Sequence, residues 1–114
     1  MVNYNNDEEL NAIFHALADS TRREMIHMLS QKESTVSELA VPFDMSLAAV
    51  SKHIKVLERA NLVERSVKGR VHSCRLNAGS LEKITAWLNM YERFWSKRFD
   101  VLEEELLKAK KKEH

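Results

Sequence analysis

Residues 44–76, DMSLAAVSKHIKVLERANLVERSVKGRVHSCRL, decide the fold of this 114-residue chain. The segment begins with a polar turn, continues as a basic helical stretch, and ends with two strand-like runs around a glycine. A helix of this kind can enter the major groove of DNA, and a hairpin with a basic tip can reach the flanking backbone. The order of these elements predicts a winged helix-turn-helix.

The helical part of this segment, which runs to about Ala60, has one apolar face. Ser46 is a typical N-cap residue, and Asn61 can adopt the left-handed conformation that ends a helix. The apolar side chains recur at the spacing of a core-facing stripe, and they are Val50, Ile54 and Leu57. The opposite, polar face is therefore the one expected to meet DNA.

Three helices are predicted before this segment. An apolar stripe indicates the first helix over residues 8–17, and Asp19 is a good N-cap for the second. Thr35 and Glu38 have the spacing of a capping box, so a short third helix is expected to start there. The fold class is therefore mainly α with a small β-hairpin, in the order of four helices, two strands and a last helix.

The hairpin is predicted from two strand-like runs, at about 62–67 and 70–76, with its turn at Lys68 and Gly69. Pairing around that turn places Cys74 opposite Val63, on the buried face of the hairpin. This position favours a small buried hydrophobe. Neighbouring cations could lower the pKa of the thiol, so a redox role for Cys74 stays as an alternative.

A long apolar stripe follows and predicts one continuous helix over about 78–110, which completes a single domain over 1–114. Its first turns are expected to pack on the chain's own core. Its later turns would leave a large exposed aromatic patch on a monomer, and the first helix has a second apolar face. A two-fold homodimer is therefore expected. Its interface residues would be Leu10, Ile13, Phe14, Leu17, Trp87, Leu88, Tyr91, Phe94, Trp95, Phe99 and Leu102.

The charge is unevenly distributed, although the net charge is only +1. Residues 1–19 contain four acidic and no basic side chains, whereas residues 46–75 contain seven basic and two acidic ones. A neutral protein with one basic segment suits a local phosphate-binding face. A solvated basic surface would have the same composition, so the charge alone leaves both interpretations open.

Small and apolar residues in the first turn of the fourth helix would allow a close approach to base edges. That turn lacks Arg, Asn and Gln, so part of the specificity is expected from DNA shape and the wing. Two arginines at the start of the second helix are expected to hold phosphate. The residues expected to contact DNA are Arg22, Arg23, Ser46, Leu47, Ala49, Ser51, Lys52, His53, Lys55, Lys68 and Arg70.

Other classes of protein find little support. No apolar run approaches a membrane span, and the polar N-terminal residues do not resemble a secretory signal, so a cytoplasmic protein is expected. One cysteine excludes an internal disulfide and a multi-cysteine metal cluster. Phosphate loops and nucleophile elbows are absent, so no enzyme activity, cofactor or metal is expected.

The chain resembles the ArsR-type, or arsenic-repressor-like, winged-helix regulators over about residues 8–107. The resemblance rests on FHALADSTRREMIHML, on TVSELAVPFDMSLAAVSKHIKVLERANLVERSVKGRVHSCRL, and on WLNMYERFWSKRFDVLEEEL. It implies a winged helix-turn-helix that dimerises through its first and last helices. It also implies a repressor that binds an inverted-repeat operator in double-stranded DNA until an effector releases it.

The chain departs from the metal-sensing members of that family. They carry a Cys-x-Cys pair in the third helix, where this sequence reads Ser37-Glu38-Leu39-Ala40-Val41. Some also carry Asp and His pairs in the last helix, whereas residues 78–110 contain no His. Soft and borderline metals require thiolates and imidazoles. The resemblance is therefore to a subgroup without the metal-binding cysteines, whose effector the sequence does not identify.

Two other functions are compatible with the sequence. A winged helix can bind a partner helix in place of DNA, and an aromatic dimer interface can hold a small apolar molecule. The first alternative predicts weak, salt-labile DNA binding without a preferred sequence. The second predicts a melting temperature that shifts with the ligand.

Overall fold

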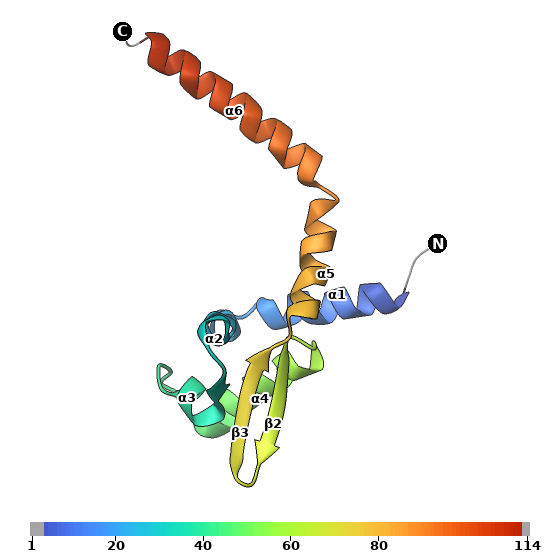
Figure 1. Cartoon of the computed structure of the whole chain (residues 1–114), viewed down its shortest axis with the longest axis vertical. Coiled ribbons are helices and arrows are strands. Elements are labelled where there is room, and N and C mark those ends of the chain that lie inside the picture. Colours follow the sequence, from blue (N-terminus) through green and yellow to red (C-terminus); the bar gives the residue numbers. More distant parts are fainter. Residues whose placement is uncertain (1–3, 113–114) are drawn as a thin grey trace. The chain divides into compact units, whose positions relative to one another are not determined.

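The computed structural model describes residues 4–112 (Figure 1). Its elements are α1 (Tyr4–Leu17), α2 (Ser20–Gln31), β1 (Ser34–Thr35), α3 (Val36–Ala40), α4 (Leu47–Arg59), β2 (Val63–Lys68), β3 (Val71–Leu76), α5 (Ala78–Asn89) and α6 (Glu92–Lys112). The ends of the domain predicted over 1–114 lie outside the described residues. The chain divides into two units, Met1–Ile84 and Thr85–His114.

The predicted helix starts are confirmed by their capping bonds. The side chain of Asp19 accepts the backbone N–H of Arg22 at 3.0 Å, and Ser46 accepts that of Ala49 at 3.1 Å. Thr35 begins α3 with a complete capping box. These bonds satisfy N–H groups that have no partner inside their own helix. Polar residues at three positions therefore fix where α2, α3 and α4 begin.

The wing is an antiparallel hairpin of β2 and β3, and the short strand β1 pairs with the other edge of β3. Lys68 pairs with Val71, so the turn consists of Gly69 and Arg70, one residue later than predicted. The predicted register was wrong, because this shift places Cys74 opposite Arg65, and Val63 opposite Leu76.

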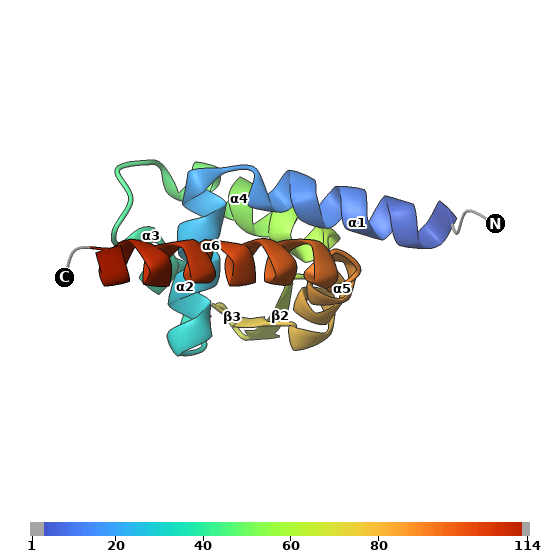
Figure 2. The same cartoon turned by 90° about the horizontal axis from the view of Figure 1, so that it is seen from above.

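The core of the first unit lies beneath α4 and the sheet. The predicted inward face of α4, Val50, Ile54 and Leu57, is fully buried. Figure 2 shows α1 lying along α4, and Ile13 and Ala16 of α1 join the same cluster. Asn61 ends α4 with a φ of 57°, as predicted for a left-handed helix end. The inner face of α4 therefore packs in the core, and its opposite face is left exposed.

The prediction of one continuous helix over 78–110 was wrong, because α5 ends at Asn89 and α6 begins at Glu92. At the junction, the N–H of Tyr91 donates to the carbonyl of Leu88, which is the tight bonding typical of a helix end. Asparagine favours such ends, since its side chain competes for backbone groups. No helix within residues 4–112 is long and apolar enough to cross a membrane.

Candidate nucleic-acid interface

The outward face of α4 presents cations without acidic partners. Lys52 and Lys55 are exposed, and neither has an ion pair within residues 4–112. Ser51 is half-buried beside them, and Leu47 is 56% exposed in the first turn. An exposed leucine next to unpaired lysines is a surface suited to a partner that is both anionic and partly apolar, such as a DNA groove.

The tip of the wing continues this pattern. Lys68 and Arg70 are exposed and have no ion pair in the described part of the chain, whereas Arg75 at the base of β3 pairs with Glu64 at 2.6 Å. Gly69 has a φ of 62°, and its missing side chain leaves open space. The glycine therefore permits the tight turn that carries the two cations.

Three residues predicted for DNA contact have partners inside the protein. Nε of Arg22 donates to the carbonyl of Ala16 at 2.7 Å, and its Nη1 lies 3.1 Å from Nδ1 of His53. Arg23 donates to the carbonyl of Leu17 at 2.7 Å. These bonds cap the C-terminal carbonyls of α1. His53 thus joins α4 to the start of α2 and does not lie on the outward face of α4.

The electrostatics of this corner are consistent with a structural role. The backbone N–H of Arg22 lowers the pKa of Asp19 below its usual value, and the nearby guanidinium and imidazole act in the same direction. Asp19 therefore remains an anion beside Arg22 and His53 over the neutral pH range. Asp19 offsets one of the two arginine charges at this corner, and both guanidiniums donate to carbonyls of α1.

Arg22→Met is expected to lower the stability of the protein by about 1–3 kcal/mol, because it leaves carbonyls of α1 without their donor. Thermal or urea unfolding measures this loss. The salt dependence of DNA binding should stay unchanged. A salt slope that falls by about one would show instead that Arg22 contacts a phosphate, as the sequence predicted.

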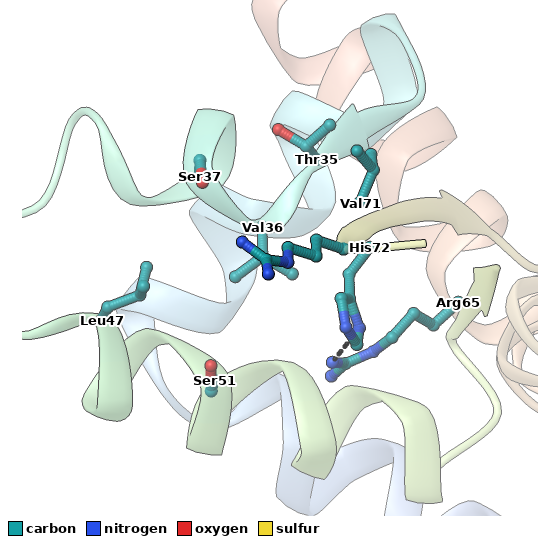
Figure 3. Close-up of a pocket in the computed structure, with 9 residues that line it drawn as sticks. Thr35, Val36, Ser37, Leu47, Ser51, Arg65, Val71 and His72 are labelled. Carbon is teal, nitrogen blue, oxygen red and sulfur yellow. Dashed lines mark hydrogen bonds between the residues drawn. The ribbon is translucent and has the colours of Figure 1, made fainter. Parts of the chain in front are cut away.

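A groove of about 390 Å³ separates the wing from the two helices of the helix-turn-helix (Figure 3). Its volume lies in the range of sites that hold small molecules. Nη1 of Arg65 lies 3.3 Å from Nδ1 of His72, across the floor of the hairpin. The lining residues are Thr35, Val36, Ser37, Leu47, Ser51, Arg65, Arg70, Val71 and His72.

Sequence reasoning did not identify Arg65, His72 or Ser37 as members of a site. Arg65 and His72 lie diagonally across the hairpin, since Arg65 pairs with Cys74 and His72 pairs with Val67. The predicted turn also brought these two residues close together, but hairpin pairing alone did not mark them as part of a site. The usable signal was the order of Glu58, Arg65 and His72 at seven-residue intervals along the helix–hairpin segment. This order has no fixed meaning until the elements are placed.

Cys74 is fully buried in the core of the first unit, as predicted. Burial raises the pKa of the thiol, and the nearby charge of Arg65 opposes this effect only in part. The thiolate that redox chemistry requires is therefore disfavoured. Within residues 4–112, no three His, Cys, Asp or Glu side chains gather where they could hold a metal ion.

The residues predicted for a dimer interface fall into three groups. Ile13 is fully buried in the core of its own chain, so it is not available to a partner. Leu10, Leu17, Trp87 and Trp95 are half-buried. The exposed members are Phe14, Leu88, Tyr91, Phe94, Phe99 and Leu102. Most of the predicted apolar stripe is therefore on the surface of the single chain.

The fold and the basic face together define a winged helix-turn-helix protein of the DNA-binding class. Comparisons with known proteins agree, since a model of helix-turn-helix domains matches residues 17–66. The HTH-type transcriptional regulator Rv2034 of Mycobacterium tuberculosis is 36% identical over 84 residues, which cover 74% of this chain and 76% of that protein. The arsenical resistance operon repressor of Staphylococcus aureus is 34% identical over 83 residues, which cover 73% and 80%.

Solved structures extend the similarity to the three-dimensional level. The crystal structure of an ArsR family transcriptional regulator has a TM-score of 0.76 and 42% identity, and the match covers 84% of this chain and 97% of that one. The chain belongs to the ArsR family of helix-turn-helix transcription regulators. Members of this family regulate transcription by binding DNA and are not enzymes.

Proposed function

We propose that the protein is a homodimeric repressor that binds an inverted-repeat operator through two copies of α4 and its wing. The observation that carries the proposal is the set of exposed cations that have no ion pair in the described residues, on the face of α4 and at the wing tip: Lys52, Lys55, Lys68 and Arg70. Cations without internal partners can neutralise phosphates at no cost in broken ion pairs. Leu47 and Ser51 are placed on the same side for contacts to base edges.

The exposed apolar stripe of α6 supports the dimer. Phe94, Phe99 and Leu102 are each more than half exposed in the single chain. A patch of this kind marks an interaction surface. A second copy is the occupant that the two-fold symmetry of an inverted repeat requires.

The proposed effector is not a metal. Ser37-Glu38-Leu39-Ala40-Val41 occupies the place of the Cys-x-Cys pair, and the one cysteine of the chain is buried. A thiophilic ion would therefore lack its ligands in α3. We further propose a cytoplasmic location, because a transcription regulator of this kind acts where the DNA is.

Selection from randomised duplex DNA at near-physiological salt, followed by sequencing, tests the proposal. The expected result is an enriched inverted repeat with half-sites about one helical turn apart, or a multiple of that. A preparation of folded protein that enriches no sequence would overturn it and favour a winged helix that binds another protein.

Arg70→Ala is expected to weaken binding to every sequence and to reduce the slope of log affinity against log salt by about one. The reason is that Arg70 has no internal partner among the described residues and lies at the wing tip. Arg75→Ala in the following strand β3 is the matched control, since Glu64 already neutralises that side chain. Equal slopes for Arg70→Ala and the wild type would contradict a contact between wing and phosphate.

A further inference from the structure

We propose that the groove between α3, α4 and the wing binds a phosphate group of the DNA backbone. Arg70 and His72 are its donors, and Arg65 is the residue that positions His72. This inference rests on the proposed function and deepens it, because it places a specific backbone contact between the recognition helix and the wing. It also adds His72 and Arg65 to the DNA-binding machinery.

The chemistry of the lining selects an anion. Two arginines, a histidine and three hydroxyl groups line the groove, and the lining contains no carboxylate. Such a surface is complementary to a phosphate, which accepts several hydrogen bonds and carries negative charge. Arg70 is the cation there without an ion pair in the described chain, so a phosphate would supply the missing counter-charge.

The contact with Arg65 fixes how His72 can act. A guanidinium has donors only, so Nδ1 of His72 must accept the bond from Nη1 of Arg65 at 3.3 Å. A neutral ring then carries its proton on Nε2, which has no hydrogen-bond partner within residues 4–112. His72 lines the groove and thus offers one N–H donor of defined tautomer to an occupant.

Arg65 is itself held by the recognition helix. Its Nη2 donates to Oε1 of Glu58 at 2.5 Å, and its side chain is only 16% exposed. The chain of bonds from Glu58 to Arg65 to His72 therefore links α4, β2 and β3. These bonds orient His72 from the helix side, in the way that outer-shell groups orient ligand-binding side chains.

The path of the DNA leads through this groove. When α4 lies in the major groove and the wing reaches the neighbouring minor groove, one sugar–phosphate strand separates the two. That strand must pass between the helix and the wing. The groove with Leu47 and Ser51 on one side and Val71 and His72 on the other occupies this place (Figure 3).

The test uses operator duplexes from the selection experiment, each with one phosphate replaced by a neutral methylphosphonate. Fluorescence anisotropy measures their affinities for the wild-type protein. We expect one phosphate per half-site, on the strand between the contacted major groove and the adjacent minor groove, at which neutralisation weakens binding about tenfold or more. The same replacement should have little effect on a protein that lacks the donor.

His72→Phe is expected to lower affinity for the unmodified operator about tenfold, the effect of losing a hydrogen bond to a charged group. On the duplex with the methylphosphonate at that position, His72→Phe and the wild type should bind equally, because the contact with His72 is already lost. His72→Gln retains an N–H donor and should restore part of the affinity. His27→Phe is the matched control, since His27 is exposed on α2 outside the groove.

Arg65→Met tests the positioning role. It should weaken operator binding in the wild-type background. In the His72→Phe background it should cause little further loss of affinity, because both changes remove the same contact. Melting temperatures show whether Arg65→Met still folds. His72 is exposed, so its variants remain informative even if the Arg65 variant does not fold.

The outcomes separate the inference from the proposed function. If the first selection enriches no specific duplex, the proposed function itself is overturned. Specific binding that is equal for His72→Phe and the wild type would overturn the phosphate contact alone. A groove that binds inorganic phosphate, with chemical-shift changes lost in His72→Phe but operator affinity unchanged, would identify a small-anion site and equally contradict the DNA contact.

Discussion

Lys52→Glu is expected to abolish operator binding, with a loss of more than about a hundredfold in affinity. Lys52 is exposed on the outward face of α4, where no carboxylate in the described residues neutralises it. The substitution removes a cation from the surface that faces DNA and adds an anion there. Placing like charges against each other at an interface costs several kcal/mol. A gel-shift titration against the selected operator and against unrelated duplexes measures the loss, which should be similar for both.

Lys32→Glu is the matched control, because it makes the same change in net charge away from α4. Lys32 is exposed after α2 and forms a surface pair with Glu38, which contributes little to stability. This variant should retain nearly all of its affinity. Undiminished binding by Lys52→Glu would show that the outward face of α4 does not meet DNA.

Phe99→Glu is expected to convert the dimer to a monomer. Phe99 is 66% exposed in the single chain, so the change is tolerated there, but a dimer through α6 would bury one introduced carboxylate from each copy. An unpaired buried charge costs about 3–5 kcal/mol, which corresponds to a dissociation constant more than about a hundredfold higher. Sedimentation equilibrium measures the association, and operator affinity should fall with it because each half-site is then bound alone.

Met90→Glu is the control for this experiment. Met90 is also well exposed, but it lies at the junction of α5 and α6 and outside the predicted interface set. The control should remain dimeric. A monomeric wild type, or a Phe99→Glu protein that stays dimeric, would contradict the role assigned to α6.

Local signals were sufficient to predict the winged helix-turn-helix. The caps at Asp19, Thr35 and Ser46 and the left-handed Asn61 each depend on a few neighbouring residues, and the structure confirms them. The buried stripe of α4 was equally readable, since it follows the 3.6-residue period of a helix. Local chemistry therefore determined the elements that carry the candidate interface.

Features that depend on long-range pairing were not predicted. The two-residue strand β1 is too short to show alternation, and it exists because β3 offers Cys74 and Ser73 as partners. The hairpin turn was predicted one residue too early, so the predicted partner of Cys74 was wrong.

Charge type alone did not reveal which cations are available to DNA. Arg22 and Arg23 have the composition and position of phosphate ligands, yet their guanidiniums bind carbonyls of α1. Nothing in the local sequence shows that both guanidiniums fold back onto the last carbonyls of α1. The structure leaves the predicted cations of α4 and the wing tip exposed, whereas the arginines at the corner of α1 and α2 have hydrogen-bond partners inside the protein.

Operator spacing tests the central claim, a symmetric dimer that reads two half-sites, most directly. Affinity is measured for the selected operator and for versions with about 5 or about 10 base pairs inserted between the half-sites. The account predicts that about 5 base pairs, half a helical turn, remove most of the affinity, because the second α4 then faces away from its groove. About 10 base pairs return the half-site to the same face and should bind better than about 5. Affinity that does not change with about 5 inserted base pairs would contradict the account.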